Sequence, residues 1–207
     1  MSECFEIALP VLPDTANLQL ADPSLVNFYS DLQNRTYWLN DEINNYTFDL
    51  VQYIIKWNRE DKDIPVENRK PIKLLIYSYG GDGQACFSLI NVIGLSKTPV
   101  YTINMGVAMS AGFLILLAGH KRFCLKDSTA LAHSGSGGAS GTFEQTEAQM
   151  KDYKRFVEVM RNYIVERTDI DTKTLNKYKS KEWYLYSQDQ IKYKIVDKII
   201  DDIEEIM

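Results

Sequence analysis

A single serine lies in an otherwise small and apolar stretch of the sequence, GVAMSAGFLILLAG, which runs from Gly106 to Gly119. The apolar run after Ser110 predicts a helix that begins at about this residue, so the hydroxyl would stand at a helix N-terminus. Free N–H groups and a partial positive charge at that end stabilise a developing oxyanion. This placement suits a nucleophile for acyl transfer, although a small residue here can also serve only as a cap or a packing site.

Acyl transfer also needs a base, and the chain contains only two histidines. His120 follows the expected helix beside Lys121 and Arg122, a place typical of a solvated histidine near the last carbonyl groups. His133 instead ends the apolar segment TALA and opens a segment rich in Gly and Ser, which predicts an imidazole at the rim of a sheet. We therefore favour His133 as the base, although spacing alone leaves a purely structural role open.

The elements that would position these residues alternate between strands and helices. In chain order the sequence predicts a buried strand at PIKLLIYS, a tight turn at YGGDG, a helix at QACFSLINVIGL and a second strand at PVYTINM, closed by Gly106. The pattern continues through GFLILLAG, RFCL and TALAH, which predicts an α/β fold with right-handed crossovers around one core. Because Ala108 stands two residues before Ser110, the nucleophile elbow G-x-S-x-G of lipase-type hydrolases is absent.

The flanking segments carry weaker signals. The first forty-odd residues predict an irregular arm around a short strand, TYWL. A helix follows, whose predicted apolar face consists of Phe48, Val51, Ile54 and Ile55.

Two later helices are predicted from capping boxes, Thr142 with Gln145 and Ser187 with Gln190. The first of these helices is long and has an apolar stripe formed by Tyr153, Phe156, Val157, Met160 and Ile164. We interpret this stripe as a packing surface against the core or a partner.

Composition excludes several classes of function. The net charge is −5 and no basic stripe is present, so we expect no binding of nucleic acid. The longest apolar run, Phe113–Ala118, is too short to cross a bilayer, and the N-terminus has no signal-peptide pattern. The cysteines are odd in number and widely spaced, which predicts neither a disulfide framework nor a zinc site and favours a cytoplasmic location; they are Cys4, Cys86 and Cys124.

Four segments together resemble the proteolytic subunit of the Clp protease, a family of serine peptidases. In chain order they are YGGDG, GVAMSAGFLILLAG, KRFCLKDS and LAHSGSGGASG. The resemblance runs from about Phe28 to Ile199 and implies the ClpP/crotonase fold, an α/β spiral of repeated β-β-α units with a protruding strand-helix handle at about 134–166. It divides the chain into an irregular arm at 1–27, a peptidase domain at 28–200 and an acidic tail at 201–207.

Carried over to this sequence, the resemblance makes Ser110 the nucleophile and His133 its base. It assigns the oxyanion hole to the backbone N–H groups of Gly81 and Ala111, and the segment 135–141 to a strand that pairs with the substrate. It also implies a serine endopeptidase that assembles with itself, as two stacked heptameric rings, and that receives unfolded polypeptides from an AAA+ Clp unfoldase. ATP would be consumed by the unfoldase, so the resemblance implies no cofactor or metal on this chain.

The sequence departs from the family pattern at three places. Tyr79 and Gly135 stand where the family has prolines, and Tyr178 stands where it has the catalytic aspartate. The nearby carboxylates Asp169, Asp171 and Glu182 would need a different loop path to reach the histidine. Two alternatives therefore remain: a weak or inactive ring subunit of the same family, and, less favoured because of Ser110 and His133, a crotonase-type acyl-CoA enzyme.

Overall fold

The computed structural model describes residues 22–206, and the chain divides between Asn34 and Arg35 into two units. The described part of the first unit contains α1 (Pro23–Gln33). Asp22 caps this helix by accepting a hydrogen bond from the Ser24 N–H at 2.8 Å. The helix begins inside the arm that was predicted to be irregular, because Asp-Pro is itself a start signal for a helix; the rest of that arm lies outside the described residues.

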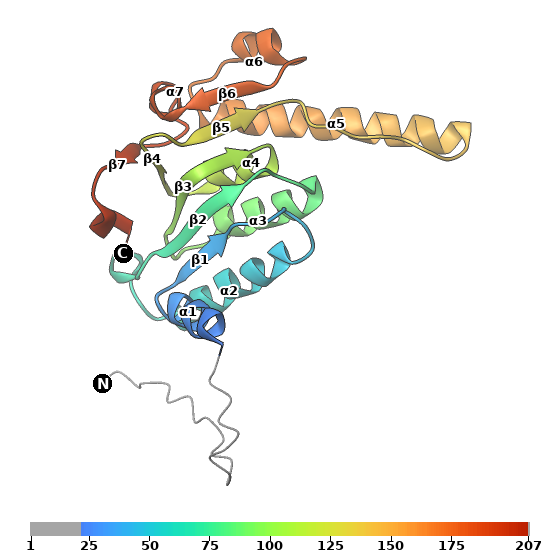
Figure 1. The fold of residues 1–207 in the computed structure, drawn as a ribbon. Helices are drawn as coiled ribbons and strands as arrows, with labels where there is room; N and C mark the ends of the chain where they lie inside the picture. Colours follow the sequence, from blue (N-terminus) through green and yellow to red (C-terminus); the bar gives the residue numbers. More distant parts are fainter. Residues whose placement is uncertain (1–21, 207) are drawn as a thin grey trace. The chain divides into compact units, whose positions relative to one another are not determined.

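The second unit is built on a seven-stranded sheet in which five strands follow the order β1-β2-β3-β4-β7 and are all parallel (Figure 1). The strands are β1 (Thr36–Leu39), β2 (Ile72–Ser78), β3 (Val100–Met109), β4 (Lys121–Leu125), β5 (Thr129–Ala132), β6 (Trp183–Tyr186) and β7 (Lys198–Ile200). The predicted α/β class and the strands at TYWL, PIKLLIYS, RFCL and TALA are therefore confirmed.

The sheet forks along β3. Its first half pairs with β4 and its second half pairs in parallel with β5, which in turn pairs antiparallel with β6. The prediction that Gly106 closes β3 is wrong, since the strand continues to Met109. Gly106 has φ +151°, a conformation that glycine adopts readily, and this allows the strand to change partners without ending.

A row of helices, each packed on the next, covers one face of the sheet (Figure 1). They are α2 (Thr47–Glu60), α3 (Gly83–Leu95), α4 (Ala111–Ala118) and α5 (Phe143–Arg167). The unit also contains α6 (Thr172–Tyr178), α7 (Ser187–Lys192) and the short 3₁₀ turns η2 (Val66–Asn68) and η3 (Ile203–Ile206). Every residue of α4 is buried, which explains why this segment is apolar on all sides. No helix within 22–206 is long and apolar enough to cross a membrane.

The predicted face of α2 is only partly correct. Val51 and Ile54 are buried, but Phe48 is 52% exposed and Ile55 46% exposed. The helix instead buries Trp57, together with Leu50, on the same side as Val51 and Ile54. The core-facing side is thus rotated from the predicted one, although both patterns have helical spacing.

The two predicted capping boxes have different outcomes. The box of Thr142 and Gln145 at the start of α5 is confirmed. The second box is wrong: the carboxylate of Asp189 accepts the Tyr186 N–H at 3.3 Å, and Gln190 is buried. The Gln190 amide donates to the carbonyls of Ser128 and Leu185, both at 3.1 Å, because buried acceptors need partners more than an exposed helix end does.

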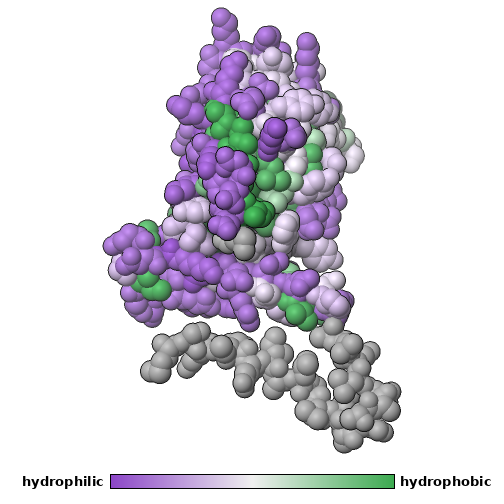
Figure 2. All heavy atoms as spheres, turned by 60° about the vertical axis from the view of Figure 1, so that its left-hand side comes forward, coloured by the Kyte–Doolittle hydropathy of each residue, from purple (hydrophilic) through white to green (hydrophobic). Residues whose placement is uncertain are grey.

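The acidic tail folds back onto the face of the sheet that lacks the long helices. Ile206 is buried with Leu75, Ile103 and Ile200, and the Lys73 ammonium donates to the Ile206 carbonyl at 3.2 Å. Figure 2 brings this side of the molecule forward and shows apolar residues gathered between hydrophilic ones. The end of the chain is therefore part of the packing of the sheet.

A buried ion pair joins the residue before β1 to the residue after α2. The Arg35 guanidinium donates to both carboxylate oxygens of Asp61, at 2.5 and 2.7 Å, and the Thr98 hydroxyl donates at 2.8 Å. The Asp61 side chain is only 1% exposed. These hydrogen bonds, above all those from Arg35, lower the pKa of the Asp61 carboxyl.

We expect Asp61→Asn to lower the free energy of unfolding by about 3 to 5 kcal/mol at neutral pH, because it leaves the Arg35 charge without its buried partner. A lowered native pKa stabilises the fold above the unfolded pKa of about 3.9, and this contribution is lost as the pH falls through the native pKa. The difference between the two proteins should therefore shrink below about pH 4. Urea unfolding at several pH values measures this difference, with Asp63→Asn, at an exposed carboxylate that does not contact Arg35, as the control.

Candidate active site

Ser110 is the single residue that connects β3 to α4. Its φ of +53° and ψ of −118° are rare for a residue with a side chain, and such strain is typical of functional positions. Its N–H is held by the Leu131 carbonyl at 3.0 Å. The predicted start of the helix at this serine is confirmed, and the hydroxyl stands at the N-terminus of a buried helix.

His133 directly follows β5, the strand that pairs with the end of β3. Met109 is opposite Leu131 in this parallel pair, so the residues that follow the two strands emerge side by side. The Nε2 atom of His133 lies 2.7 Å from the Oγ of Ser110. When the ring proton is on Nδ1, Nε2 accepts a hydrogen bond from the serine hydroxyl. This is the geometry in which an imidazole removes a hydroxyl proton.

Two backbone N–H groups beside Ser110 are free to bind an oxyanion. The bridge between Ile43 and Gly81 uses the Gly80 carbonyl, at 2.9 Å, and the Asp82 N–H, at 2.7 Å, so it leaves the Gly81 N–H unused. The Ala111 N–H, in the first turn of α4, likewise has no hydrogen-bond partner within the described range. These are the two groups that the sequence analysis named as oxyanion donors.

Glycine is required at the turn that brings Gly81 close. A Cβ on Gly80 would lie 2.7 Å from the Ser110 Cβ, and a Cβ on Gly81 would lie 2.2 Å from the Ile43 carbonyl oxygen. Both residues also have positive φ, +107° and +146°. The double glycine after β2 therefore allows the backbone to approach the candidate nucleophile.

None of the carboxylates considered in the sequence analysis reaches the histidine. Asp169 pairs with the Lys194 ammonium at 2.9 Å, Asp171 accepts the Thr174 N–H at 2.7 Å, and Glu182 accepts the Tyr184 hydroxyl at 2.6 Å. In the part of the chain that the structure describes, Nδ1 of His133 has no hydrogen-bond partner.

Known proteins are similar in sequence to this chain over most of its length. Residues 24–203 match the Clp protease family. The chain belongs to this family. One relative, the "ATP-dependent Clp protease proteolytic subunit 2" of Treponema denticola, is 33% identical over 66% of this chain and 70% of its own. A second, the "ATP-dependent Clp protease proteolytic subunit" of Dehalococcoides mccartyi, is 30% identical over 84% of this chain and 85% of its own.

A third relative, the "ATP-dependent Clp protease proteolytic subunit 2" of Treponema pallidum, is 29% identical over 85% of this chain and 87% of its own. Membership of the Clp protease family makes the chain a serine-type peptidase in general terms, and it confirms the fold that the sequence predicted.

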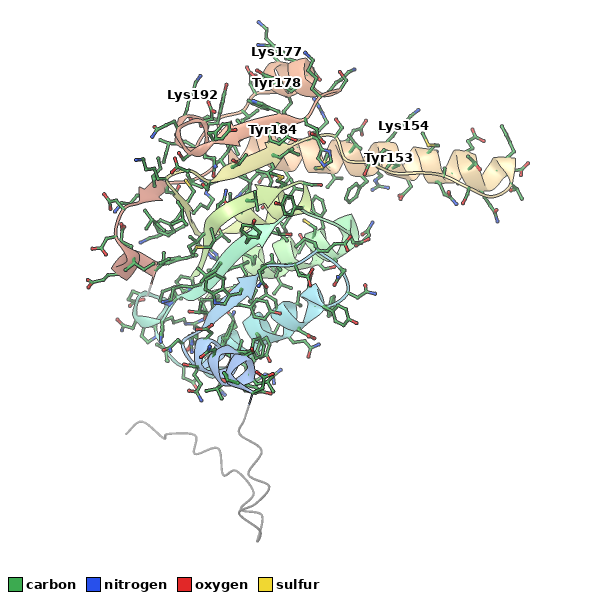
Figure 3. The ribbon with its side chains drawn as sticks, viewed as in Figure 1. Tyr153, Lys154, Lys177, Tyr178, Tyr184 and Lys192 are labelled. Atoms are coloured by element: carbon green, nitrogen blue, oxygen red, sulfur yellow. The ribbon has the colours of Figure 1, made fainter. Side chains whose placement is uncertain are left out.

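Tyr178 ends α6 and is held by its two neighbours. Its ring stacks on Trp183 with the centroids 4.2 Å apart and the planes 7° apart, and the Lys177 ammonium lies 5.3 Å from its centroid. Figure 3 shows Lys177 and Tyr178 on α6. Tyr178 and His133 line the same small cavity, but no hydrogen bond within 22–206 joins them.

The segment between His133 and α5 forms no strand, whereas the resemblance implied a strand followed by a helix. It is held to α5 at both ends: the Gln149 amide bonds to both the N–H and the carbonyl of Ser140, at 3.0 and 3.1 Å, and the Tyr153 hydroxyl donates to the Ser134 carbonyl at 3.2 Å. Its four glycines weaken any strand, and no neighbouring strand within the described residues pairs with it.

Several supporting contacts were not foreseen from the sequence. Ile43 positions Gly81, and the Cys86 thiol lies 3.3 Å from the Ala111 carbonyl under the start of α4. Trp183 holds Tyr178 by stacking. His120 lies outside the site, and its Nδ1 accepts the Val100 N–H at 2.9 Å. Only the double glycine gave a local signal, because the other partners are distant along the chain.

Gly81→Ala should slow the reaction of Ser110 with a fluorophosphonate probe by about 100-fold or more, the usual effect of losing one oxyanion donor. The reason is that the new Cβ cannot stay 2.2 Å from the Ile43 oxygen, so the Gly81 N–H must move. Gly94→Ala on α3, where a Cβ meets nothing within 4 Å, is the matched control. A folded Gly81→Ala protein that labels at the wild-type rate would contradict this oxyanion site.

Proposed function

We propose that this chain is the proteolytic subunit of an ATP-dependent Clp-type protease and cleaves bonds within polypeptides through an acyl intermediate on Ser110. The observation that carries the proposal is the 2.7 Å contact between Ser110 Oγ and His133 Nε2, next to two free backbone N–H donors. The names of the relatives, which specify an ATP-dependent protease and its proteolytic subunit, support the same role.

In this mechanism Ser110 Oγ attacks the scissile carbonyl while its proton passes to Nε2 of His133. The N–H groups of Gly81 and Ala111 bind the oxyanion that develops on the carbonyl oxygen. The imidazolium then gives its proton to the leaving amine, and an acyl ester remains on Ser110. Water, deprotonated by His133, hydrolyses this ester and restores the serine.

We also propose that copies of this chain assemble into stacked heptameric rings that receive unfolded polypeptides from an AAA+ Clp unfoldase in the cytoplasm. Apolar side chains exposed on α5 support an assembly surface: Phe143, Met150 and Val159 are 78%, 45% and 47% exposed. The buried, unpaired thiols of Cys86 and Cys124 are consistent with a reducing compartment. The chain itself would need no metal or nucleotide, because a serine, an imidazole and backbone donors suffice for this chemistry.

One observation favours a weak form of the activity. No carboxylate within residues 22–206 bonds to the base, and a neutral phenol such as that of Tyr178 cannot stabilise an imidazolium as a carboxylate does. Loss of the triad carboxylate lowers turnover by about 10⁴ in the chymotrypsin-type example. We therefore propose that Tyr178 occupies an atypical third position, and that the isolated chain is slow or depends on an active partner subunit.

Ser110 should be the only serine that a fluorophosphonate probe modifies rapidly, because among the serines within residues 22–206 it alone combines a nearby imidazole with free backbone donors. Peptide mapping by mass spectrometry after labelling identifies the site. Ser110→Ala should abolish labelling and peptide hydrolysis, whereas Ser88→Ala, on the exposed side of α3, should change neither. Modification of Ser134 with Ser110 untouched would disprove the assignment.

Tyr178→Asp should raise the labelling rate of Ser110 by about tenfold or more, a part of what the complete triad provides. The new carboxylate would accept a hydrogen bond from the Nδ1–H group and stabilise the imidazolium. Tyr178→Asn is the matched control, since it has nearly the same shape as the Asp variant but no charge. Equal rates in the two variants, or a wild type that already labels as fast as a complete triad, would show that this position does not limit the base.

A further inference from the structure

A small cavity of about 20 Å³ adjoins the imidazole of His133. Tyr178, Trp183, Arg161 and Lys179 are among the residues that line it. Ser110, whose Oγ lies 2.7 Å from Nε2 of His133, is not among the residues that line it. One water molecule needs roughly 10–15 Å³ in such a measure, so only the smallest polar groups fit.

The lining of this cavity is largely apolar, its two charged residues are Arg161 and Lys179, and it contains no carboxylate. Arg161 donates to the neutral Asn176 side chain at 2.7 Å, and neither Arg161 nor Lys179 has an acidic partner within residues 22–206. Lys177 is also nearby on α6, over the Tyr178 ring. Two cations without acidic partners, lining the same cavity as an imidazole, favour an anion over water there.

Tyr178 does not fill the role of this anion. Trp183 on one side and Lys177 near its ring hold the phenol by stacking and cation–π contact, and its hydroxyl makes no hydrogen bond within the described residues. Within the described residues Nδ1 of His133 therefore has no hydrogen-bond partner, and His133 borders a space with room for a small acceptor.

We propose that this cavity is a binding site for a small carboxylate-class anion, such as formate, which takes the place of the missing triad carboxylate. The anion accepts the Nδ1 proton in a hydrogen bond and stabilises the imidazolium that forms when Ser110 loses its proton to Nε2. No covalent bond forms to the anion, and it leaves unchanged. The inference rests on the proposed role of Ser110 and His133, and makes the peptidase dependent on an anion from solution.

The first experiment measures the rate of fluorophosphonate labelling of Ser110 in the full chain with sodium formate. Sodium gluconate at the same ionic strength is the control, because the whole gluconate anion is too bulky for the cavity although it also carries a carboxylate. We expect a saturable rise of several-fold with formate and none with gluconate. A rate that is the same in both salts would overturn the anion site while leaving the role of Ser110 intact.

Substitutions of the residues that line the cavity test whether formate binds there. Lys179→Met and Arg161→Met should each raise the formate concentration needed for half of the effect, whereas Lys151→Met, on the exposed surface of α5 and outside the cavity, should not. Tyr178→Asp should make labelling insensitive to formate, because its own carboxylate would occupy the site. If all four variants depend on formate in the same way as the wild-type protein, the anion binds elsewhere and the proposal is overturned.

A second readout does not require activity. The ¹⁵N and ¹H signals of the His133 imidazole should shift with formate and saturate at the same concentration as the labelling effect, and gluconate should leave them unchanged. If Ser110 never labels but the signals shift, the anion site stands and the proposed peptidase function fails. If the signals do not move, the anion site is disproved whatever the labelling rate.

Discussion

The parallel pairing of β5 with the second half of β3 holds the candidate catalytic pair together. Ser110 and His133 are 23 residues apart in the chain, yet each is placed just beyond the end of one of these two strands. A shift of one residue in this register would turn every side chain of β5 to the opposite face. The 2.7 Å contact therefore depends on strand register more than on any interaction between the two side chains themselves.

The same region combines rigid support with local strain. The buried helix α4 fixes the start of the turn, while Ser110 and the two glycines after β2 all have positive φ. The surroundings maintain these conformations: Leu131 holds the Ser110 N–H, and Ile43 bridges to Gly81. Strain of this kind persists only where packing and hydrogen bonds determine the backbone on several sides.

The groups that surround the oxyanion differ in kind from those that surround the base. On the oxyanion side, two backbone donors are preorganised and need no titratable group. On the side of the base, the imidazole faces a cavity whose charged lining residues, Arg161 and Lys179, are cations. The described part of the chain therefore provides two preorganised donors for the developing oxyanion but no carboxylate bonded to the imidazole.

The sequence by itself determined the local elements and the kinds of residue that the chemistry needs. Alternating strand and helix patterns predicted the α/β class, the apolar run predicted α4, and the double glycine predicted a tight turn. These are properties of short segments, for which spacing and conformational preference are sufficient. The placement of His133 left its role open, because a lone histidine at a sheet rim is also compatible with a structural one.

Only the tertiary structure decided which distant residues meet. It showed that β3 continues past Gly106 to pair with β5, that α2 buries Trp57 instead of Phe48, and that Gln190 satisfies buried carbonyls instead of capping a helix. It also showed that Asp169, Asp171 and Glu182 are all bonded elsewhere. Register, burial and the choice of hydrogen-bond partner depend on contacts between segments far apart in the chain, so no local pattern could determine them.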